Sequence, residues 1–245
     1  MDQQTKHDLK QDHFITTTGH GLEWASENRR SVLITSAILL GVIVLAVVFA
    51  LIANRRSEAA SVGFGEAMQV YQAPLVTPGQ PPLPGIKMYA SAKERAQTAN
   101  ALFRKVADTY GSTADGKNAR YFVGLTDEEA GQNQAAESTL NTVAAGWDKD
   151  LASLAKLALA DLYRQTGRDA QAVDLYKDLT NKPTNAVSAG LAQIQLAELY
   201  TAEGKVDEAH RIYAQLKDHD AKGVAGVLAA QKLNPTAAAA APPQL

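Results

Sequence analysis

An uncharged run of 23 residues, Ser31–Ala53, constrains the fold of this chain more than any other feature. At about 1.5 Å per residue, a helix of this length spans roughly 35 Å, enough to cross a hydrocarbon core of about 30 Å. A cleaved signal peptide has a shorter apolar region that ends in small residues, whereas this run comes after a polar stretch and ends at Asn54-Arg55-Arg56. We therefore predict a retained transmembrane helix.

The charges beside the run and the size of the C-terminal part of the chain set the expected direction of this helix. Two arginines flank each end, and Lys6 and Lys10 add positive charge on the N-terminal side. The large, patterned part of the chain lies entirely on the C-terminal side, as in proteins whose uncleaved anchor is also the export signal. We expect the N-terminus to be cytoplasmic and the C-terminal domain to lie across the membrane.

The remaining sequence divides by composition. Residues 1–30 form a polar segment without a sustained apolar period, which predicts a flexible tail. Its histidines, His7, His13 and His20, are six and seven residues apart, so they do not lie one helical turn apart, and a solvated tail is favoured over a metal site. A C-terminal tail, residues 234–245, is expected to be disordered because it is rich in alanine and proline.

Residues 54–92 link the predicted membrane helix to the rest of the chain. Apolar residues recur at helical spacing over Ser57–Gln72, so the membrane helix is expected to continue, or to restart, as an amphipathic helix. Five prolines then fall within Ala73–Ile86, where they remove backbone donors and fix φ. We predict an extended loop there.

Residues 93–233 contain an internal repeat. The segments Ala158–Leu179 and Leu196–Leu216 match at a constant offset of 37 residues, which pairs small residues, a glycine and tyrosines. The matched pairs are Ala160 with Ala197, Tyr163 with Tyr200, Gly167 with Gly204, Ala172 with Ala209, Tyr176 with Tyr213, and Leu179 with Leu216. A weaker copy contains Gly124, Gly131, Ala136 and Leu140, and part of an earlier one contains Ala99, Phe103 and Val106.

Each matched position suggests a structural role. Alanines let two antiparallel helices approach closely, a glycine closes the first helix in the left-handed conformation, and a tyrosine packs against the next unit. The pattern resembles the tetratricopeptide repeat, whose usual period is about 34 residues. The predicted fold class is all-α: one transmembrane helix followed by an α-helical tetratricopeptide-like solenoid, with Ala221–Leu233 as a C-terminal capping helix.

Repeats of this kind present a concave surface that is built from the first helix of each unit and can bind a peptide or a partner's helix. Transferring the family's inward-facing positions gives a candidate partner groove, although internal packing of its leucines is an equally good explanation at any one position. The groove residues are Tyr121, Leu125, Leu154, Leu157, Asp161, Arg164, Gln165, Leu191, Ile194, Glu198 and Thr201.

Other functional classes find little support in the sequence. A formal net charge of −2 argues against nucleic-acid binding, and a chain without cysteine has no thiolate nucleophile or thiolate metal site. Catalytic and phosphate-binding motifs are also missing, and His210 and His219 lie among charged neighbours. The acidic residues at 127–129 and 218–220 lie near expected helix ends, where capping and solvation explain them. We expect a non-enzymatic protein without a cofactor or metal.

The order of these elements resembles the YfgM-like bacterial inner-membrane proteins. The resemblance covers most of Gly21–Leu216 and includes GLEWASENRR before the apolar run and GFGEAMQVYQAP after it, whereas the proline-rich segment departs from the pattern. It implies a periplasmic repeat domain, an ancillary role at the SecYEG translocon, and contact with a periplasmic chaperone such as PpiD. The alternative from the residues alone is a scaffold subunit of another envelope assembly, such as a secretion or pilus complex.

Overall fold

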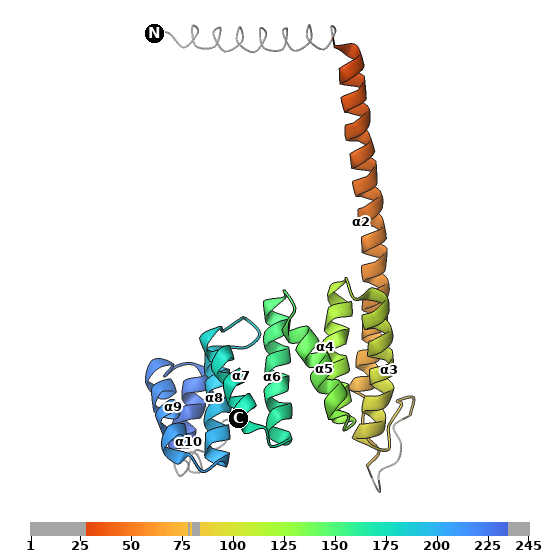
Figure 1. The fold of residues 1–245 in the computed structure, drawn as a ribbon. Helices are drawn as coiled ribbons and strands as arrows, with labels where there is room; N and C mark the ends of the chain where they lie inside the picture. Colours follow the sequence, from red (N-terminus) through yellow and green to blue (C-terminus); the bar gives the residue numbers. More distant parts are fainter. Residues whose placement is uncertain (1–27, 78, 80–83, 235–245) are drawn as a thin grey trace, which may run out of the picture. The chain divides into compact units, whose positions relative to one another are not determined.

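The fold is described by a computed structural model, which covers residues 28–77, 79 and 84–234. Within these residues it contains nine α-helices and no β-strand (Figure 1), so the predicted all-α fold class is confirmed. The predicted tails fall mostly on residues 1–27 and 235–245, which lie outside the described part. The helices are α2 (Arg29–Tyr71), α3 (Ala92–Tyr110), α4 (Ala114–Glu129), α5 (Asn133–Ala144), α6 (Lys149–Gln165), α7 (Asp169–Asn181), α8 (Ala189–Ala202), α9 (Val206–His219) and α10 (Val224–Leu233).

Helix α2 contains the uncharged run. Of the described helices, it is the one that is long and apolar enough to cross a membrane, and its apolar window has no residue buried inside the protein. Such exposure distinguishes it from the core helix of a soluble protein, which would be covered by neighbouring elements. The helix continues through Ser57 to Tyr71 without a break, so the first of the two alternatives drawn from the sequence is the one observed.

The helical hairpins of the repeat domain have the same capping chemistry in each unit. Helices α4, α6 and α8 each begin at a Ser, Thr or Asp whose side chain accepts a hydrogen bond from a backbone N–H in the first turn. They end at Gly131, Gly167 and Gly204, with φ of 81°, 70° and 76°. The backbone N–H of the residue after each glycine donates a hydrogen bond back to the helix, which closes a Schellman motif. In α6 this bond runs from the Arg168 N–H to the Tyr163 carbonyl at 2.8 Å. The predicted role of these glycines is confirmed.

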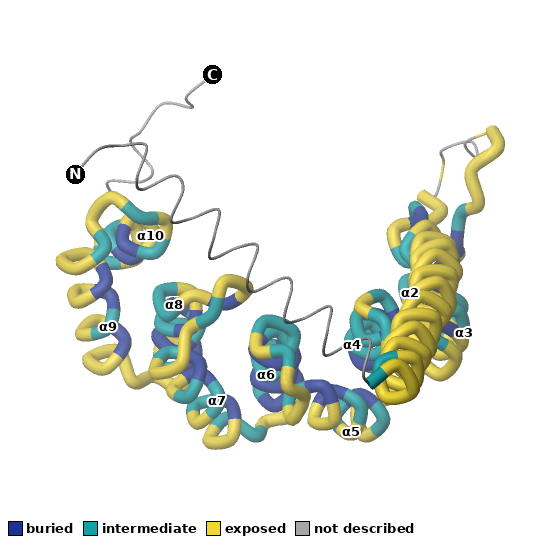
Figure 2. The backbone as a smooth tube through the Cα atoms, turned by 90° about the horizontal axis from the view of Figure 1, so that it is seen from above, coloured by how far each residue is buried: buried dark blue, intermediate teal, exposed yellow. Residues whose placement is uncertain are grey.

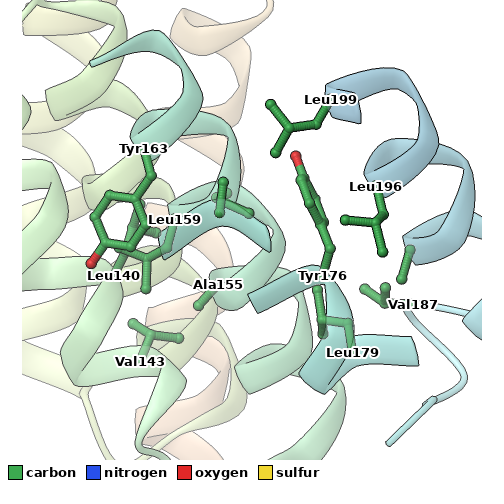
Figure 3. Packing of buried hydrophobic residues seen from close by; sticks show 14 residues of the cluster. Leu140, Val143, Ala155, Leu159, Tyr163, Tyr176, Leu179, Val187, Leu196 and Leu199 are labelled. Atoms are coloured by element: carbon green, nitrogen blue, oxygen red, sulfur yellow. The ribbon is translucent and has the colours of Figure 1, made fainter. Parts of the chain in front are cut away.

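Neighbouring units share an apolar core. Tyr176 is fully buried and packs with Leu179, Val187 and Leu196, which come from α7, α8 and the loop between them (Figure 3). The small residues of the repeat, including Ala160 and Ala197, are fully buried as well. No unit could bury these faces alone, so each helix pair depends on its neighbours.

The repeat helices lie in two rows, as seen along them in Figure 2. Helices α4, α6 and α8 form one row, called the inner row here, and α5, α7 and α9 form the other, the outer row. Helix α10 packs on α9 and α8, and its Ala229 is buried in the last core cluster. The predicted capping helix is therefore present at the end of the inner row.

The first unit adds a cluster of aromatic rings to its buried alanines. Phe64 and Tyr71, from the end of α2, contact Phe103 of α3 and Phe122 of α4, and the centroids of the Phe103 and Phe122 rings are 5.1 Å apart. Tilted and stacked ring pairs at such distances add to the free energy gained by burial. The final turns of α2 thus form part of the repeat core.

The predicted proline-rich loop comes next in the chain. The described residues between α2 and α3, 72–77, 79 and 84–91, contain no helix. Backbone hydrogen bonds from the Val76 N–H to the Tyr89 carbonyl at 2.8 Å and from the Tyr89 N–H to the Pro74 carbonyl at 3.1 Å join the two ends of the loop. Tyr89 is itself buried, so it anchors this loop to the domain.

The structure corrects the sequence interpretation of Asp127. Capping and solvation were expected to explain it, but its side chain is only 1% exposed. Arg104 Nη2 binds Asp127 Oδ2 at 2.6 Å, and Asn100 Nδ2 donates to Asp127 Oδ1 at 2.8 Å. Asn100 and Arg104 lie one turn apart on α3, so together they compensate the desolvation of the carboxylate. This polar contact joins α3 to α4.

The hairpin glycines give a test of this fold. We expect Gly167→Ala to lower the free energy of unfolding by about 1 kcal/mol, because an alanine side chain disfavours positive φ. Gly65→Ala is the matched control: Gly65 is helical and an added methyl group meets no atom within 4 Å, so a small gain in stability of about 0.5 kcal/mol is expected. Urea unfolding of the full-length chain in mild detergent, followed by circular dichroism, measures both. Equal effects of the two substitutions would contradict the assigned turn.

Candidate functional site

A cavity of about 710 Å³ opens along the inner row and is called the inner groove here. Helices α4, α6 and α8 supply most of its lining, and the first turn of α7 supplies one residue. Its lining residues are Tyr121, Leu125, Glu128, Leu154, Leu157, Ala158, Asp161, Arg164, Gln165, Asp169, Leu199, Ala202 and Glu203.

Seven of the residues predicted from the repeat offsets line this groove. Two are on α4 and five on α6, where spacings of three and four residues place side chains on one helical face. These residues are Tyr121, Leu125, Leu154, Leu157, Asp161, Arg164 and Gln165. Their convergence is a property of the fold, and their role in binding remains a prediction.

The four residues predicted on α8 do not line the groove. Ile194 is 5% exposed and packs in the same cluster as Ala229 of α10, while Glu198 Oε1 accepts a hydrogen bond from Lys232 Nζ at 2.8 Å. Helix α10 therefore covers this face of α8, which corrects the expectation for both residues. The other two predicted residues, Leu191 and Thr201, also lie outside the groove lining.

Several groove residues were missed by the sequence interpretation, although the repeat contains a signal for some of them. In the register of the hairpin glycines, Glu128 lies 36 residues before Arg164, and Ala202 lies 37 residues after Gln165. Applying the offset to every unit would have found both. Asp169 and Glu203 flank the hairpin glycines, and no helical offset predicts them.

Hydrogen bonds orient two of the carboxylates that line the groove. Gln165 Nε2 donates to Glu128 Oε1 at 2.7 Å, which joins α6 to α4. The Tyr176 hydroxyl donates to Asp161 Oδ1 at 2.7 Å, so a tyrosine of the shared core holds an acidic side chain of the groove. Both acceptors are thereby fixed by neutral donors.

Arg164 is the one basic residue in the lining. Its Nη1 donates to Gln195 Oε1 of α8 at 3.2 Å and lies 3.8 Å from Asp161 Oδ1. Against this guanidinium, the lining contains the carboxylates Glu128, Asp161, Asp169 and Glu203. The inner groove therefore carries an excess of acidic groups.

Burial affects the titration of two groove residues. Partial burial raises the pKa of the Glu128 carboxyl; the hydrogen bond from Gln165 opposes this shift, and the nearby Asp161 carboxylate adds to it. Burial also raises the pKa of Tyr121 to about 12, with smaller contributions from Tyr71, Asp161 and Glu128. An ionised Glu128 is thus incompletely compensated by its surroundings.

The lining combines leucines with hydrogen-bonding and acidic side chains. Within the described ranges, no group of three or more His, Cys, Asp or Glu side chains is arranged to hold a metal ion. Apolar surface interrupted by fixed polar groups is the usual character of a site that binds part of another molecule through many weak contacts.

Comparison with known proteins supports the repeat interpretation. Residues 23–235 match the model of the tetratricopeptide repeat-like domain family. Two crystal structures of putative kinesin light chain TPR-like repeats from Podosopora anserina, one of them carrying a substitution, are similar in fold. Each has 20% identity and a TM-score of 0.52, and the match covers 73% of this chain and 84% of the other. Comparison with curated protein sequences finds no significant match.

Burial of Glu128 in the groove and ion pairing of Asp178 outside it predict opposite effects of these two carboxylates on stability. A carboxyl whose pKa is raised on folding opposes stability once the pH rises through its folded-state pKa. We therefore expect Glu128→Gln to leave thermal stability at neutral pH unchanged or higher. Lys156 and Lys182 instead lower the pKa of Asp178, which contributes stability above its unfolded-state pKa and loses it as the pH falls.

Asp178→Asn is therefore the contrasting variant and is expected to lower the melting temperature at neutral pH. Thermal unfolding of the full-length variants at neutral and acidic pH measures both effects. A clear destabilisation by Glu128→Gln at neutral pH would show that the carboxylate is required for folding rather than available to a ligand.

Proposed function

Because the chain belongs to the tetratricopeptide repeat-like domain family, we propose that it is a non-enzymatic, membrane-anchored adaptor that binds protein partners in the inner groove. The observation that carries this proposal is the convergence of α4, α6 and α8 on one cavity of about 710 Å³. Repeat arrays of this type bind extended or helical polypeptides along the surface built by their first helices.

The groove lining suits a polypeptide. Leu125, Leu154 and Leu157 offer apolar surface to the side chains of a bound segment. Arg164 and Gln165 offer hydrogen-bond donors that backbone carbonyls of an extended segment accept. Apolar contacts would supply most of the affinity, and the polar groups would set the register of the segment.

The location proposed for this adaptor is the bacterial inner membrane, with α2 as its single span. Its N-terminus would be cytoplasmic and its repeat domain periplasmic. Support comes from the uncharged, unburied segment of α2 and from the resemblance of the whole layout to YfgM-like proteins. On this basis the partners are components of the SecYEG translocon and a PpiD-like periplasmic chaperone.

A photocrosslinking experiment tests the binding surface. A photoreactive amino acid in place of Leu157, within the groove, should give adducts with other proteins in intact membranes. The same amino acid in place of Lys177, an exposed residue of the outer row, is the control and should give far fewer.

The identity of the adducts separates the proposed roles. Translocon or chaperone subunits would support the export role, whereas subunits of a secretion or pilus complex would favour the alternative scaffold. Equal yields at the two positions, or adducts at Lys177 alone, would contradict binding in the inner groove.

Membrane topology provides an independent test. A reporter that is active only in the periplasm should be active when fused to the C-terminus, because the proposed span places the repeat domain there. A reporter that is active only in the cytoplasm should be inactive at the same site. The reverse pattern would rule out the periplasmic location while leaving the groove intact.

A further inference from the structure

The inner groove carries more acidic than basic side chains. Four carboxylates line it, and Arg164 is its single cationic group. Lys205 Nζ lies 3.0 Å from Glu203 Oε2, at one edge, and so compensates that carboxylate. Arg164 is shared between Asp161, whose Oδ1 lies 3.8 Å away, and Gln195, while Glu128 receives its hydrogen bond from the neutral amide of Gln165. The groove between α4 and α6 therefore keeps an excess of negative charge, mainly at Glu128.

The chain contains an internal example of a lysine bound to the inner row. Glu198 lies 37 residues after Asp161 and so occupies the matching position of the next unit. Lys232 likewise lies 37 residues after Gln195. In the last unit, Lys232 Nζ binds Glu198 Oε1 at 2.8 Å, beside the apolar contacts between α10 and α8. The carboxylate at this position of the inner row thus binds a lysine carried by an apolar helix.

The corresponding position one period earlier, on α8, holds a glutamine instead of a lysine. Gln195, which matches Lys232, receives a hydrogen bond from Arg164. The ring of Tyr121 lines the groove beside Glu128, and the leucines of α6 continue the apolar surface. An ammonium or guanidinium group between two carboxylates and near an aromatic ring gains from both kinds of contact.

We propose that the inner groove selects polypeptide segments in which a lysine or arginine lies among apolar residues, with the cation bound between Glu128 and Asp161. Apolar side chains on either side of the cation would pack on Leu125, Leu154 and Leu157. This inference rests on the proposed function, because it specifies the chemistry of the segment that the adaptor binds.

Charge complementarity explains why this chemistry is preferred to a neutral segment. Bringing an apolar segment into the groove removes water from Glu128 and Asp161, and that loss is unfavourable unless a cation replaces the water. A cation on the ligand would then offset the partial burial that raises the pKa of Glu128 and would stabilise its ionised form. Acidic segments would be repelled.

Three peptides provide the probe. Each is a fluorescent ten-residue peptide with leucines in a Gly/Ser/Ala background, and the three differ only in carrying lysine, glutamine or glutamate at the centre. The full-length protein is held in nanodiscs of neutral phosphatidylcholine, with empty nanodiscs as a blank. By fluorescence anisotropy, the lysine peptide should bind about ten-fold more tightly than the glutamine peptide, as expected for a hydrogen bond to a charged group, and the glutamate peptide most weakly.

Substitutions within and outside the groove locate the effect. The double variant Glu128→Gln, Asp161→Asn keeps acceptors for Gln165 and Tyr176 and should lose the preference for lysine. Asp174→Asn, Glu208→Gln makes the same change in net charge at exposed positions of the outer row and should retain it. If the double variant fails to fold, Glu128→Gln alone should reduce the preference several-fold.

The outcomes separate this inference from the proposed function. Equal binding of the lysine and glutamine peptides, with both weakened by Leu157→Ser, would overturn the cation preference and leave the groove as a binding site. A lysine preference that survives the groove double variant would also overturn the inference. Loss of all peptide binding together with a lack of crosslinks at Leu157 would overturn the proposed function as well.

Discussion

The contact of Tyr176 between two repeat units is the interaction on which the rest of this structure depends. Its ring is fully buried against α8 (Figure 3), and its hydroxyl donates a hydrogen bond to Asp161 on the preceding α6. One side chain thus joins consecutive units and orients a carboxylate of the inner groove. Because the units are stable only when stacked, the groove exists only as a consequence of the shared core.

The apolar faces at the two ends of the stack are covered by different elements. At the C-terminal end, α10 covers the inner face of α8 and fixes Glu198 with Lys232. At the other end, the last turns of α2 supply Phe64 and Tyr71 to an aromatic cluster with α3 and α4. With α10 and the last turns of α2 in place, the open part of the inner row is formed by α4, α6 and the end of α8. The length of the groove is therefore set by how the array ends.

Much of this arrangement can be predicted from the sequence because it depends on local chemistry that repeats. Gly167 and Gly204 must come after helices in the left-handed conformation, and the paired alanines and tyrosines mark close helix contacts. Offsets of 36 and 37 residues carry the predicted groove positions from one unit to the next, and seven of the eleven predicted residues meet in one cavity. The remaining features depend on contacts between distant segments, which a single sequence does not reveal. Ile194 has an inward-facing offset, yet α10 buries it, and Asp127 lies near a helix end, yet Arg104 and Asn100 bind it across the α3–α4 interface.

Polypeptide binding by the inner groove is tested most directly by a structure of the full-length protein bound to its natural partner, purified from membranes. We expect a partner segment that lies between α4, α6 and α8, against Leu154 and Leu157, with a basic side chain near Glu128 and Asp161. A partner that contacts only the outer row, with the inner groove empty, would contradict this function of the groove.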